Sequence, residues 1–404
     1  MDTPALVLSG HVNALGVIRG LGEHRVPIVL FRHDAHDMAQ ASRYVRRSIV
    51  TTHPMADGLA FVEEIIRRAR RLRGALVVPT SDDALGAVSR YKGELADHFV
   101  VACPDWETAS ACLDKALTYR LAADHRLPAP ATVTPATLEE AIEGSRTLGF
   151  PLLVKPTQSH LYQRAFKRKL VRVADREELE RRFSEAAAAG LAVVLQEFIP
   201  GRDDDVVNYN AYCWGGEVLV EFTARQLRKA PPTFGSPRVV VSEWVPEAIS
   251  PGREVMAALS YCGFANIEMK RDARDGRFKL IEVNARHNMS SLLAVRCGVN
   301  FPLIEYRHRI QGVEPRPQRQ REGLYWFNGL QDAAYSLRGF RHEGLRFADY
   351  VRPYLRPHCD AILDRHDPGP FGARLTDLGD RAWQSAKELA RGVVLGRTGI
   401  RGLH

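Results

Sequence analysis

The chain has 404 residues, 45% of them hydrophobic and 26% charged, which is typical of a globular protein with two or three domains. No apolar run approaches the roughly 20 residues that cross a bilayer, and the first residues lack the basic and long apolar segments of a signal peptide. The net charge of +8 comes without a helix-turn-helix, zinc-finger or RNP-type pattern, so we expect a protein that binds phosphates and carboxylates and no nucleic acid.

Strand and helix signals alternate through the N-terminal quarter of the chain. Because strands separated by helices form parallel, doubly wound sheets, we expect an α/β unit here. Neither a GxGxxG fingerprint nor a GxxxxGK[ST] phosphate loop is present, so a nucleotide would have to bind by another device. The predicted strands lie at residues 5–10, 26–31, 74–83 and 98–104.

Two polar loops follow predicted strands of this sheet. Ligands of doubly wound sheets lie beyond the carboxyl ends of the strands, so Ser9-Gly10-His11 and Thr80-Ser81-Asp82-Asp83 are candidate substrate loops. Capping of the following helix explains Ser81 or Asp82 equally well. Both readings stay open from the sequence alone.

The character of the chain changes after residue 111. Residues 112–132 predict a helix that ends at Pro128 and Pro130. Helix, strand, strand, helix and strand signals then follow to about residue 195, which indicates a small α+β unit. The next stretch, to about residue 312, is rich in strand signals. A Pro- and Arg-rich linker leads from there into a C-terminal segment of two or three helices.

The segment KLIEVNARHNMSS, residues 279–291, places a carboxylate and an amide in a buried strand. Glu282 and Asn284 share one face, because successive side chains of a strand alternate. If a loop at 273–277 joins two arms of a hairpin, Glu268 lies directly opposite Glu282. Facing carboxylates are destabilising unless a cation lies between them, and carboxylate and amide oxygens suit Mg²⁺. We therefore expect a magnesium site that carries a nucleotide.

A structural alternative is that Glu268 pairs with Lys270 or Arg271 and that Asn284 only starts a turn. Arg286 favours the metal site, because it continues on the same face as Glu282 and a guanidinium there can hold phosphoryl oxygens.

Taken in order, these residues resemble the ATP-grasp ligases. IEVNAR, residues 281–286, is similar to the E-x-N-x-R metal motif of that family, and Glu268 sits where the family has its first metal ligand. Lys155 in LLVKP and Lys115 match two basic residues that reach the nucleotide phosphates. The resemblance covers about residues 1–312.

QEFIPG, residues 196–201, resembles the hinge strand where the family binds adenine. Asp204 falls where an acidic residue holds the ribose hydroxyls, but Asp203, Asp204 and Asp205 are consecutive, so this assignment can shift by one. The adenine contacts that the resemblance implies are Gln196, Glu197, Phe198 and Ile199.

The chain departs from the family just after the lysine strand, where a glycine-rich loop usually covers the phosphates. Residues 157–169 contain no glycine but are basic. Lys167, Arg168 and Lys169 are all candidates to close over ATP, and Lys169 is included among the nucleotide-binding residues.

The basic loop at 224–238 resembles the segment that lines the substrate and phosphate pocket in the branch of amino-acid ligases that includes D-aspartate ligases. It implies substrate contacts from Arg225, Arg228 and Ser236, and a solvated basic loop is the alternative. Three residues after the metal motif are further candidates for the acyl acceptor: His287, Asn288 and Ser290. Helix capping explains Asn288 or Ser290 nearly as well.

The resemblance implies the α/β ATP-grasp fold. It consists of an N-terminal parallel α/β domain at 1–111, a small α+β lid at 112–195, a larger α+β catalytic subdomain at 196–312 and a helical C-terminal extension at 313–404. The implied activity is ATP-dependent ligation of a carboxylate to an amine through an acyl phosphate, on amino acids or related small carboxylates. ATP and Mg²⁺ are the implied cofactors, with two ions expected and Mn²⁺ as a substitute.

The expected catalytic residues are Arg286, Lys155 and Arg225. One alternative is an ATP-grasp enzyme that activates a carboxylate or bicarbonate for a non-amine nucleophile. Another is an ATP-binding sensor without turnover, but no metal ligand or phosphate lysine is missing. The absence of a Met-Lys-Met biotin pattern disfavours a biotin-dependent carboxylase, and the absence of the glycine fingerprint disfavours a nicotinamide oxidoreductase.

The six cysteines are scattered without a CxxC pair, which is typical of reduced thiols in the cytoplasm. Small-molecule carboxylates and amines are the expected partners, without a membrane span. The C-terminal segment can pack on the core, form a homodimer contact or meet another protein.

Overall fold

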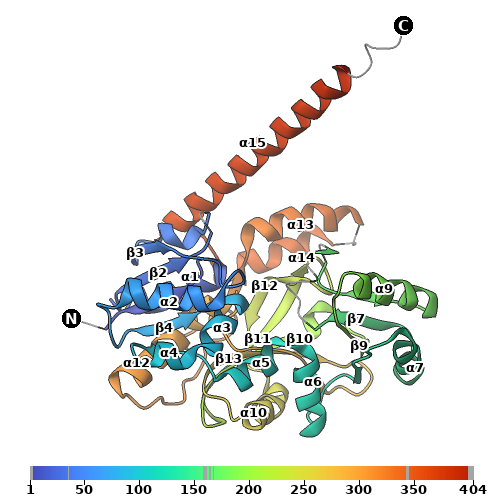
Figure 1. Ribbon diagram of the computed structural model, residues 1–404, viewed down its shortest axis with the longest axis horizontal. Helices are drawn as coiled ribbons and strands as arrows, with labels where there is room; N and C mark the ends of the chain where they lie inside the picture. The colour runs from blue at the N-terminus through green and yellow to red at the C-terminus, as the bar shows by residue number, and fades with distance from the viewer. Residues whose placement is uncertain are drawn as a thin grey trace.

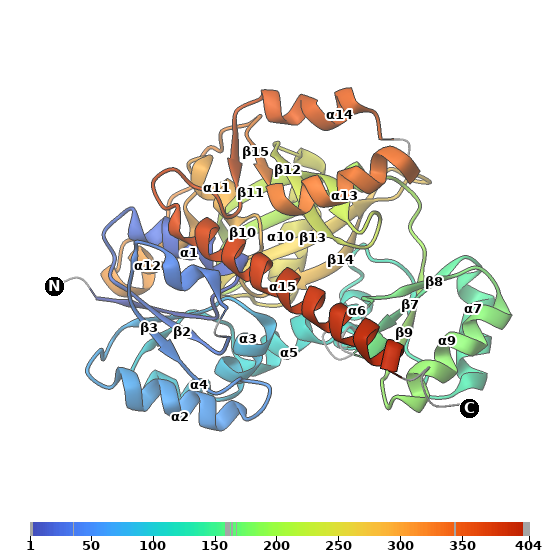
Figure 2. The ribbon, with the colours of Figure 1, turned by 90° about the horizontal axis from the view of Figure 1, so that it is seen from above.

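The computed structural model describes residues 3–398, except 35, 158–161, 163, 164, 167, 343 and 344. Three sheets organise the described chain (Figures 1 and 2). We call them the N-terminal sheet, the small sheet and the large sheet.

The N-terminal sheet has five parallel strands in the order β3-β2-β1-β4-β5, which confirms the predicted α/β unit. The sequence did not indicate β3, because this edge strand is mostly exposed and carries Arg46 and Arg47 instead of an apolar run. Charged residues on an edge strand block pairing with further strands. The strands are β1 (Ala5–Leu8), β2 (Ile28–Arg32), β3 (Val45–Val50), β4 (Leu76–Pro79) and β5 (Val100–Val101), and the helices are α1 (Val12–Gly22), η1 (Met38–Ala41), α2 (Gly58–Ala69), α3 (Asp82–Arg90) and α4 (Lys92–Ala96).

The small sheet has four antiparallel strands in the order β6-β9-β7-β8. The single helix predicted at 112–132 is instead the end of one helix and the start of another. Asp114 divides them, because its carboxylate accepts hydrogen bonds from the amides of Ala116 and Leu117, at 2.8 and 3.3 Å, and so caps a new helix. The elements are α5 (Trp106–Leu113), α6 (Lys115–Asp124), β6 (Thr132–Val133), α7 (Leu138–Leu148), β7 (Leu152–Pro156), β8 (Val171–Val173), α9 (Arg176–Ala188) and β9 (Val193–Glu197).

The large sheet has seven strands in the order β14-β13-β10-β11-β12-β15-β16. Its last two strands belong to the C-terminal extension, which is therefore not purely helical; each has three residues, too short for a periodic sequence signal. The elements up to residue 311 are η2 (Asp203–Asp205), β10 (Val206–Trp214), β11 (Glu217–Ala230), β12 (Ser236–Ser242), η3 (Pro246–Ala248), α10 (Ile249–Ala258), β13 (Gly263–Arg271), β14 (Phe278–Asn284), α11 (Ser291–Arg296) and α12 (Phe301–Gln311). The extension adds β15 (Tyr325–Phe327), α13 (Gly329–His342), α14 (Phe347–Val351), η4 (Arg352–Leu355), β16 (His358–Asp360) and α15 (Gly369–Thr398).

The register of the β13–β14 hairpin confirms the predicted pairing of Glu268 with Glu282. Beyond that pair a bulge lets Met269 face Leu280, so the ladder slips by one residue toward the turn. The strands end at Arg271 and Phe278, which leaves a turn one residue longer than expected.

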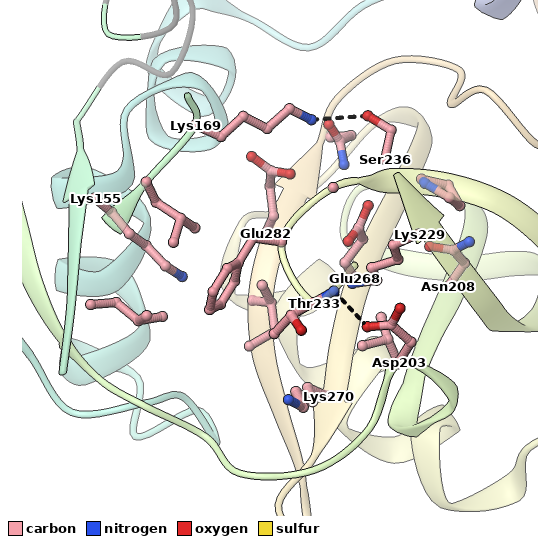
Figure 3. Close-up of a pocket in the computed structure, with 18 of the residues that line it drawn as sticks. Lys155, Lys169, Asp203, Asn208, Lys229, Thr233, Ser236, Glu268, Lys270 and Glu282 are labelled. Atoms are coloured by element: carbon pink, nitrogen blue, oxygen red, sulfur yellow. Dashed lines mark hydrogen bonds between the residues drawn. The ribbon is translucent and has the colours of Figure 1, made fainter. Parts of the chain in front are cut away.

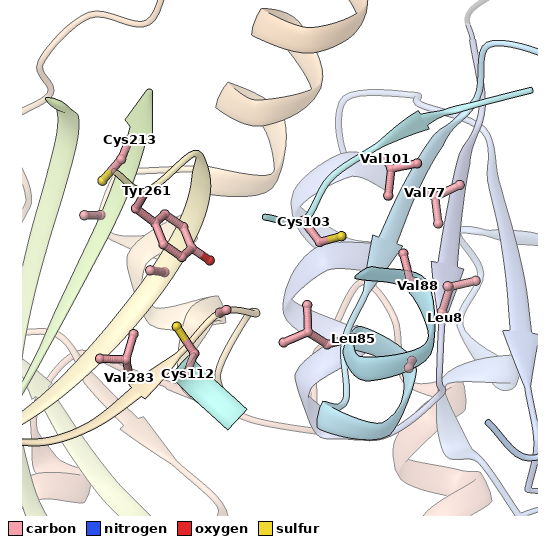
Figure 4. Packing of buried hydrophobic residues seen from close by; sticks show 14 of the residues in the cluster. Leu8, Val77, Leu85, Val88, Val101, Cys103, Cys112, Cys213, Tyr261 and Val283 are labelled. Carbon is pink, nitrogen blue, oxygen red and sulfur yellow. The ribbon is translucent and has the colours of Figure 1, made fainter. Parts of the chain in front are cut away.

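The N-terminal and large sheets share one hydrophobic core, part of which Figure 4 shows. Cys103 and Cys112 lie in it near Tyr261 and Cys213, and burial raises the pKa of both thiols to about 12. All six cysteines are free, as the sequence predicted.

The C-terminal extension is tied to the first helix by a buried ion pair. Arg19 on α1 is fully buried and donates from Nε to Asp367 at 3.1 Å, and Asp367 also accepts from the hydroxyl of Ser42 at 2.9 Å. Beyond this anchor α15 projects away from the body (Figure 1). Within the described residues, no helix combines the length and the apolar character needed to cross a membrane.

Candidate active site

A cavity of about 370 Å³ lies between the small and large sheets. Figure 3 shows Lys155 and Lys169 on one side of it, facing Glu282, Glu268 and Lys229. Sequence-predicted residues that line the cavity are Asp82, Lys115, Lys155, Lys169, Gln196, Glu197, Phe198, Ile199, Ser236, Glu268, Glu282, Asn284, Arg286 and Asn288.

Three oxygen-bearing side chains meet at the end of the β13–β14 hairpin. Glu268 and Glu282 face each other across the ladder, and Asn284 follows Glu282 on the same face. The Asn284 amide nitrogen donates to Asn266 at 3.2 Å, which leaves the amide oxygen as the acceptor. No group of three His, Cys, Asp or Glu side chains suited to a metal occurs in the described part of the chain. Two carboxylates and one amide oxygen are a hard donor set that fits Mg²⁺.

Lys115 at the start of α6 compensates the charge of Glu282. Its ammonium lies 2.8 Å from a Glu282 carboxylate oxygen. Burial alone would lower the pKa of Lys115, but the Glu282 carboxylate outweighs burial and raises it. Burial alone would raise the pKa of Glu282, yet the charge and the hydrogen bond of Lys115 lower this pKa to about 2. The pair is therefore ionised at neutral pH.

Lys155 on β7 makes no ion pair with a carboxylate of the residues that the structure describes. Its ammonium donates to the side-chain oxygen of Gln196 on the neighbouring strand β9. Burial, reinforced by the charge of Lys115, lowers the pKa of Lys155 to about 7. A lysine with this pKa is poised to become charged when an anion enters the cavity.

The predicted adenine-binding segment follows β9 along the cavity wall. Glu197, at the end of β9, is held by ion pairs with Arg274 and with Lys279, the latter at 3.7 Å. In place of Asp204, the structure brings Asp203 to the cavity, where its carboxylate accepts from the Thr233 amide at 3.0 Å. Of the three consecutive acids, Asp203 is thus the one that lines the cavity.

Arg286 links the metal motif to the N-terminal unit. Its Nε and Nη2 donate to the two carboxylate oxygens of Asp82, at 2.6 and 2.9 Å. Ser81 caps α3 by accepting from the Ala84 amide at 3.2 Å and does not line the cavity. Asn288 lines the cavity, and its side-chain oxygen is buried without a hydrogen-bond partner among the described residues.

The basic segment after β7 reaches across to the large sheet. Lys169 donates to the Ser236 hydroxyl at 3.0 Å, so these two predicted residues join the opposite walls of the cavity (Figure 3). Arg168 points to the helix α9 instead, where it pairs with Glu185 at 3.1 Å. Lys167 lies outside the described residues.

The structure does not bring Arg225 and Arg228 into the cavity. Arg225 makes two hydrogen bonds of 2.7 Å to Glu243, and Arg228 lies 3.1 Å from the buried Asp332 of the C-terminal extension. Irregular pairing of β11 with β12 at 226–229 resets the alternation of side chains, so that Lys229 lines the cavity. Lys229 is 7% exposed and has no ion pair to a described residue. In the sequence, the only indication of a role for Lys229 was its position in the basic segment 224–238.

His287 lies next to the metal motif and does not line the cavity. It is buried, and its ring stacks on Phe264 with the ring centres 4.1 Å apart. Burial, with the Arg286 charge, lowers the pKa of His287 to about 3, so its ring is neutral. Ser290, like the Ser9-Gly10-His11 loop, lies outside the cavity wall, whereas Asn13 of α1 reaches it.

Comparison with known proteins finds both curated relatives and many structural neighbours of the chain. No protein-family model matches the chain. D-aspartate ligase from Enterococcus faecium is 25% identical over 329 residues, which cover 76% of each chain.

Two solved structures illustrate the fold. The L-amino acid ligase from Bacillus licheniformis has a TM-score of 0.61 at 19% identity and covers 77% of this chain and 74% of its own. The biotin carboxylase domain of the Hydrogenobacter thermophilus 2-oxoglutarate carboxylase, in complex with MgADP, ADP and bicarbonate, has a TM-score of 0.61 at 16% identity and covers 80% and 74%. The chain therefore has the ATP-grasp fold of these enzymes, carries the E-x-N-x-R residues in it, and is similar in sequence to a D-aspartate ligase.

Proposed function

We propose that the chain is an ATP-dependent ligase that joins a carboxylate to an amine, acting on amino acids or related small carboxylates. The observation that carries the proposal is the convergence of Glu268, Glu282 and Asn284 with Lys115 and Arg286 on one cavity. The chain is similar to a D-aspartate ligase in sequence and to an L-amino acid ligase in fold, and the reactions that these two names describe support this reaction class.

The reaction that fits the site has two steps. A carboxylate oxygen of the first substrate takes the γ-phosphoryl group, and ADP leaves. The neutral amine of the second substrate then attacks the acyl carbon, so that the C–N bond forms as the C–O bond to phosphate breaks. Phosphate leaves and takes up the proton that the nitrogen loses. No nucleophilic side chain is required, since positioning and charge neutralisation supply the catalysis.

The cationic side chains of the cavity have different roles in this reaction. Lys155 and Lys115 hold phosphate oxygens from the lid side, and Arg286 faces the developing charge on the transferred group. Lys229 adds a buried ammonium group on the large sheet, which makes no ion pair with the described carboxylates. Closing Lys169 onto Ser236 keeps water from the acyl phosphate.

Glu268, Glu282 and Asn284 would hold magnesium, which when bound supplies neutralisation of the phosphate oxygens. The MgADP in the structurally similar biotin carboxylase domain supports ATP and Mg²⁺ as cofactors. We further propose two ions, with Mn²⁺ as a substitute, because one carboxylate can bridge two metals.

The test is ADP release with Mg²⁺ and ATP against a panel of amino acids, offered singly and in pairs. Turnover should require one carboxylate and one amine and should disappear in Glu282→Ala. ADP release that needs neither substrate, or that survives the substitution, would contradict the proposal. A metal titration that saturates at one ion per chain would contradict only the proposed second ion.

A further inference from the structure

A second cavity, of about 510 Å³, lies between α3 and α5. It meets the first cavity at Asp82, Lys115, Glu282 and Asn284, which line both. The proposed reaction centre can thus be reached from two sides. The first cavity carries the adenine-binding segment, so the nucleotide accounts for it. The second has the volume of a small-molecule site and has no occupant in the mechanism described above.

One face of α3 forms a wall of the second cavity. Asp83, Gly86, Ala87 and Arg90 all line it, and their spacing places them on a single stripe of the helix. The stripe starts with an acid beside the reaction centre, continues with two small residues and ends with a base. It is a groove whose two ends carry opposite charge.

The opposite wall is a stripe of α5 formed by Trp106, Ser110 and Leu113. The Arg90 guanidinium lies 4.3 Å from the centre of the Trp106 ring. Arg90 makes no ion pair or hydrogen bond to any residue that the structure describes. Next to Trp106 in the sequence, Asp105 accepts a hydrogen bond from Lys92 at 2.7 Å. A cation held on an aromatic ring without an anionic partner is prepared for a carboxylate.

The acidic end of the groove suits an amino group. Among the described residues, His53 is the only ion-pair partner of the Asp83 carboxylate, at 4.0 Å, and Asp82 next to it is bound to Arg286. An ammonium group at this end would lie beside Lys115, Glu282 and Asn284. That is where the amine must be to attack an acyl phosphate.

The length of the stripe sets the size of the ligand. Seven helical steps separate Asp83 from Arg90, and at a rise of 1.5 Å each they give about 10 Å. An extended chain covers about 3.3–3.6 Å per residue, so about three residues match the groove. A single amino acid is too short to reach both ends.

We propose that this groove binds the amine substrate, and that this substrate is an extended zwitterion whose amino group and carboxylate lie about 10 Å apart. The inference rests on the proposed ligase function. The carboxylate binds at Arg90 and Trp106, the middle runs over Gly86 and Ala87, and the amine reaches the reaction centre beside Asp82. A three-residue peptide and an ω-amino acid of the same length share this chemistry.

The experiment measures ADP release with one fixed carboxylate donor and a series of amines: alanine, dialanine, trialanine, tetraalanine, trialanine amide and 8-aminooctanoate. We expect trialanine to have at least a tenfold higher kcat/KM than alanine. Arg90→Gln should remove this advantage, with the KM for ATP unchanged. Trialanine amide should react equally with the wild type and Arg90→Gln. The matched control is Arg71→Gln, which removes another exposed arginine without an ion pair to the described residues.

Equal kcat/KM for alanine and trialanine, or an unchanged length preference in Arg90→Gln, would contradict the proposal that the groove binds the amine. Neither result would contradict the proposed ligase function. An equal response to 8-aminooctanoate and trialanine would support recognition of the separated charges, and a preference for trialanine would support a peptide. If no pair of substrates gives turnover, the ligase proposal is contradicted. The groove is then tested separately by calorimetry, which measures the binding of trialanine to the protein in the presence of Mg²⁺ and a non-hydrolysable ATP analogue. Binding that is lost in Arg90→Gln keeps the groove, and no binding to the wild type overturns it.

Discussion

Binding of Mg²⁺-ATP should be coupled to proton uptake by Lys155. In the free protein burial and the Lys115 charge lower the pKa of Lys155 to about 7. At pH 8, one unit above this value, about nine-tenths of Lys155 is neutral, and at pH 6 about one-tenth is neutral. Phosphates beside the ammonium favour its charged form and return the pKa toward the usual value for lysine. Binding should therefore take up about 0.9 proton at pH 8 and about 0.1 at pH 6.

The assay is titration calorimetry in pairs of buffers with different enthalpies of ionisation. The slope of the observed binding enthalpy against the buffer enthalpy gives the number of protons exchanged. Protons that other groups exchange are subtracted with Lys155→Met, so the difference between the two proteins at pH 8 should be about 0.9 proton. Lys169→Met is the matched control, since Lys169 lines the same cavity but is exposed. Equal slopes for the wild type and Lys155→Met at pH 8 would refute the reasoning.

Three further predictions concern the metal ligands, the basic loop and the C-terminal extension. Glu282→Ala should lower ADP release at least about 100-fold, and chelation by EDTA should abolish release until Mg²⁺ is restored. Lys229→Met should lower kcat/KM at least about tenfold, because it removes a buried cation from the cavity, whereas Arg225→Gln should change it by less than about threefold, since that arginine faces Glu243. Asp332→Ala should lower the free energy of unfolding by about 3–5 kcal/mol in urea denaturation, because it leaves two buried arginines unpaired.

The first and the third of these predictions have controls on the surface. Glu94→Ala removes an exposed carboxylate and should leave ADP release unchanged. Asp349→Ala, on the exposed side of α14, should change the free energy of unfolding by no more than about 0.5 kcal/mol. A larger loss of kcat/KM in Arg225→Gln than in Lys229→Met would contradict our placement of the basic loop. A loss in Asp332→Ala as small as that in Asp349→Ala would show that the buried arginines find other partners.

The hairpin shows how far sequence reasoning extends. The pairing of Glu268 with Glu282 could be predicted because strand alternation and one turn length determine it. The interpretation of residues 224–238 as a basic loop was wrong, because most of them belong to β11 and β12. Irregular pairing near Gln226 then breaks the alternation of side chains, so that Lys229 and not an arginine lines the cavity. A bulge leaves no periodic trace in the sequence.

Two other differences have simple physical causes. The edge strand β3 carries charge where a buried strand carries apolar residues, so its sequence is typical of a loop. The strands β15 and β16 are held by pairing with distant partners, and such contacts depend on the tertiary structure. The second cavity was also beyond prediction, because it depends on how α3 and α5 face each other.

The buried pair of Arg19 and Asp367 bears on how the chain matures on the ribosome. Domains generally fold from the N-terminus as synthesis proceeds, at about 5–20 residues per second. Here the first helix cannot neutralise its buried guanidinium until the segment around Asp367 has been made and has left the exit tunnel. The N-terminal sheet therefore spends tens of seconds of synthesis without the segment that covers this face.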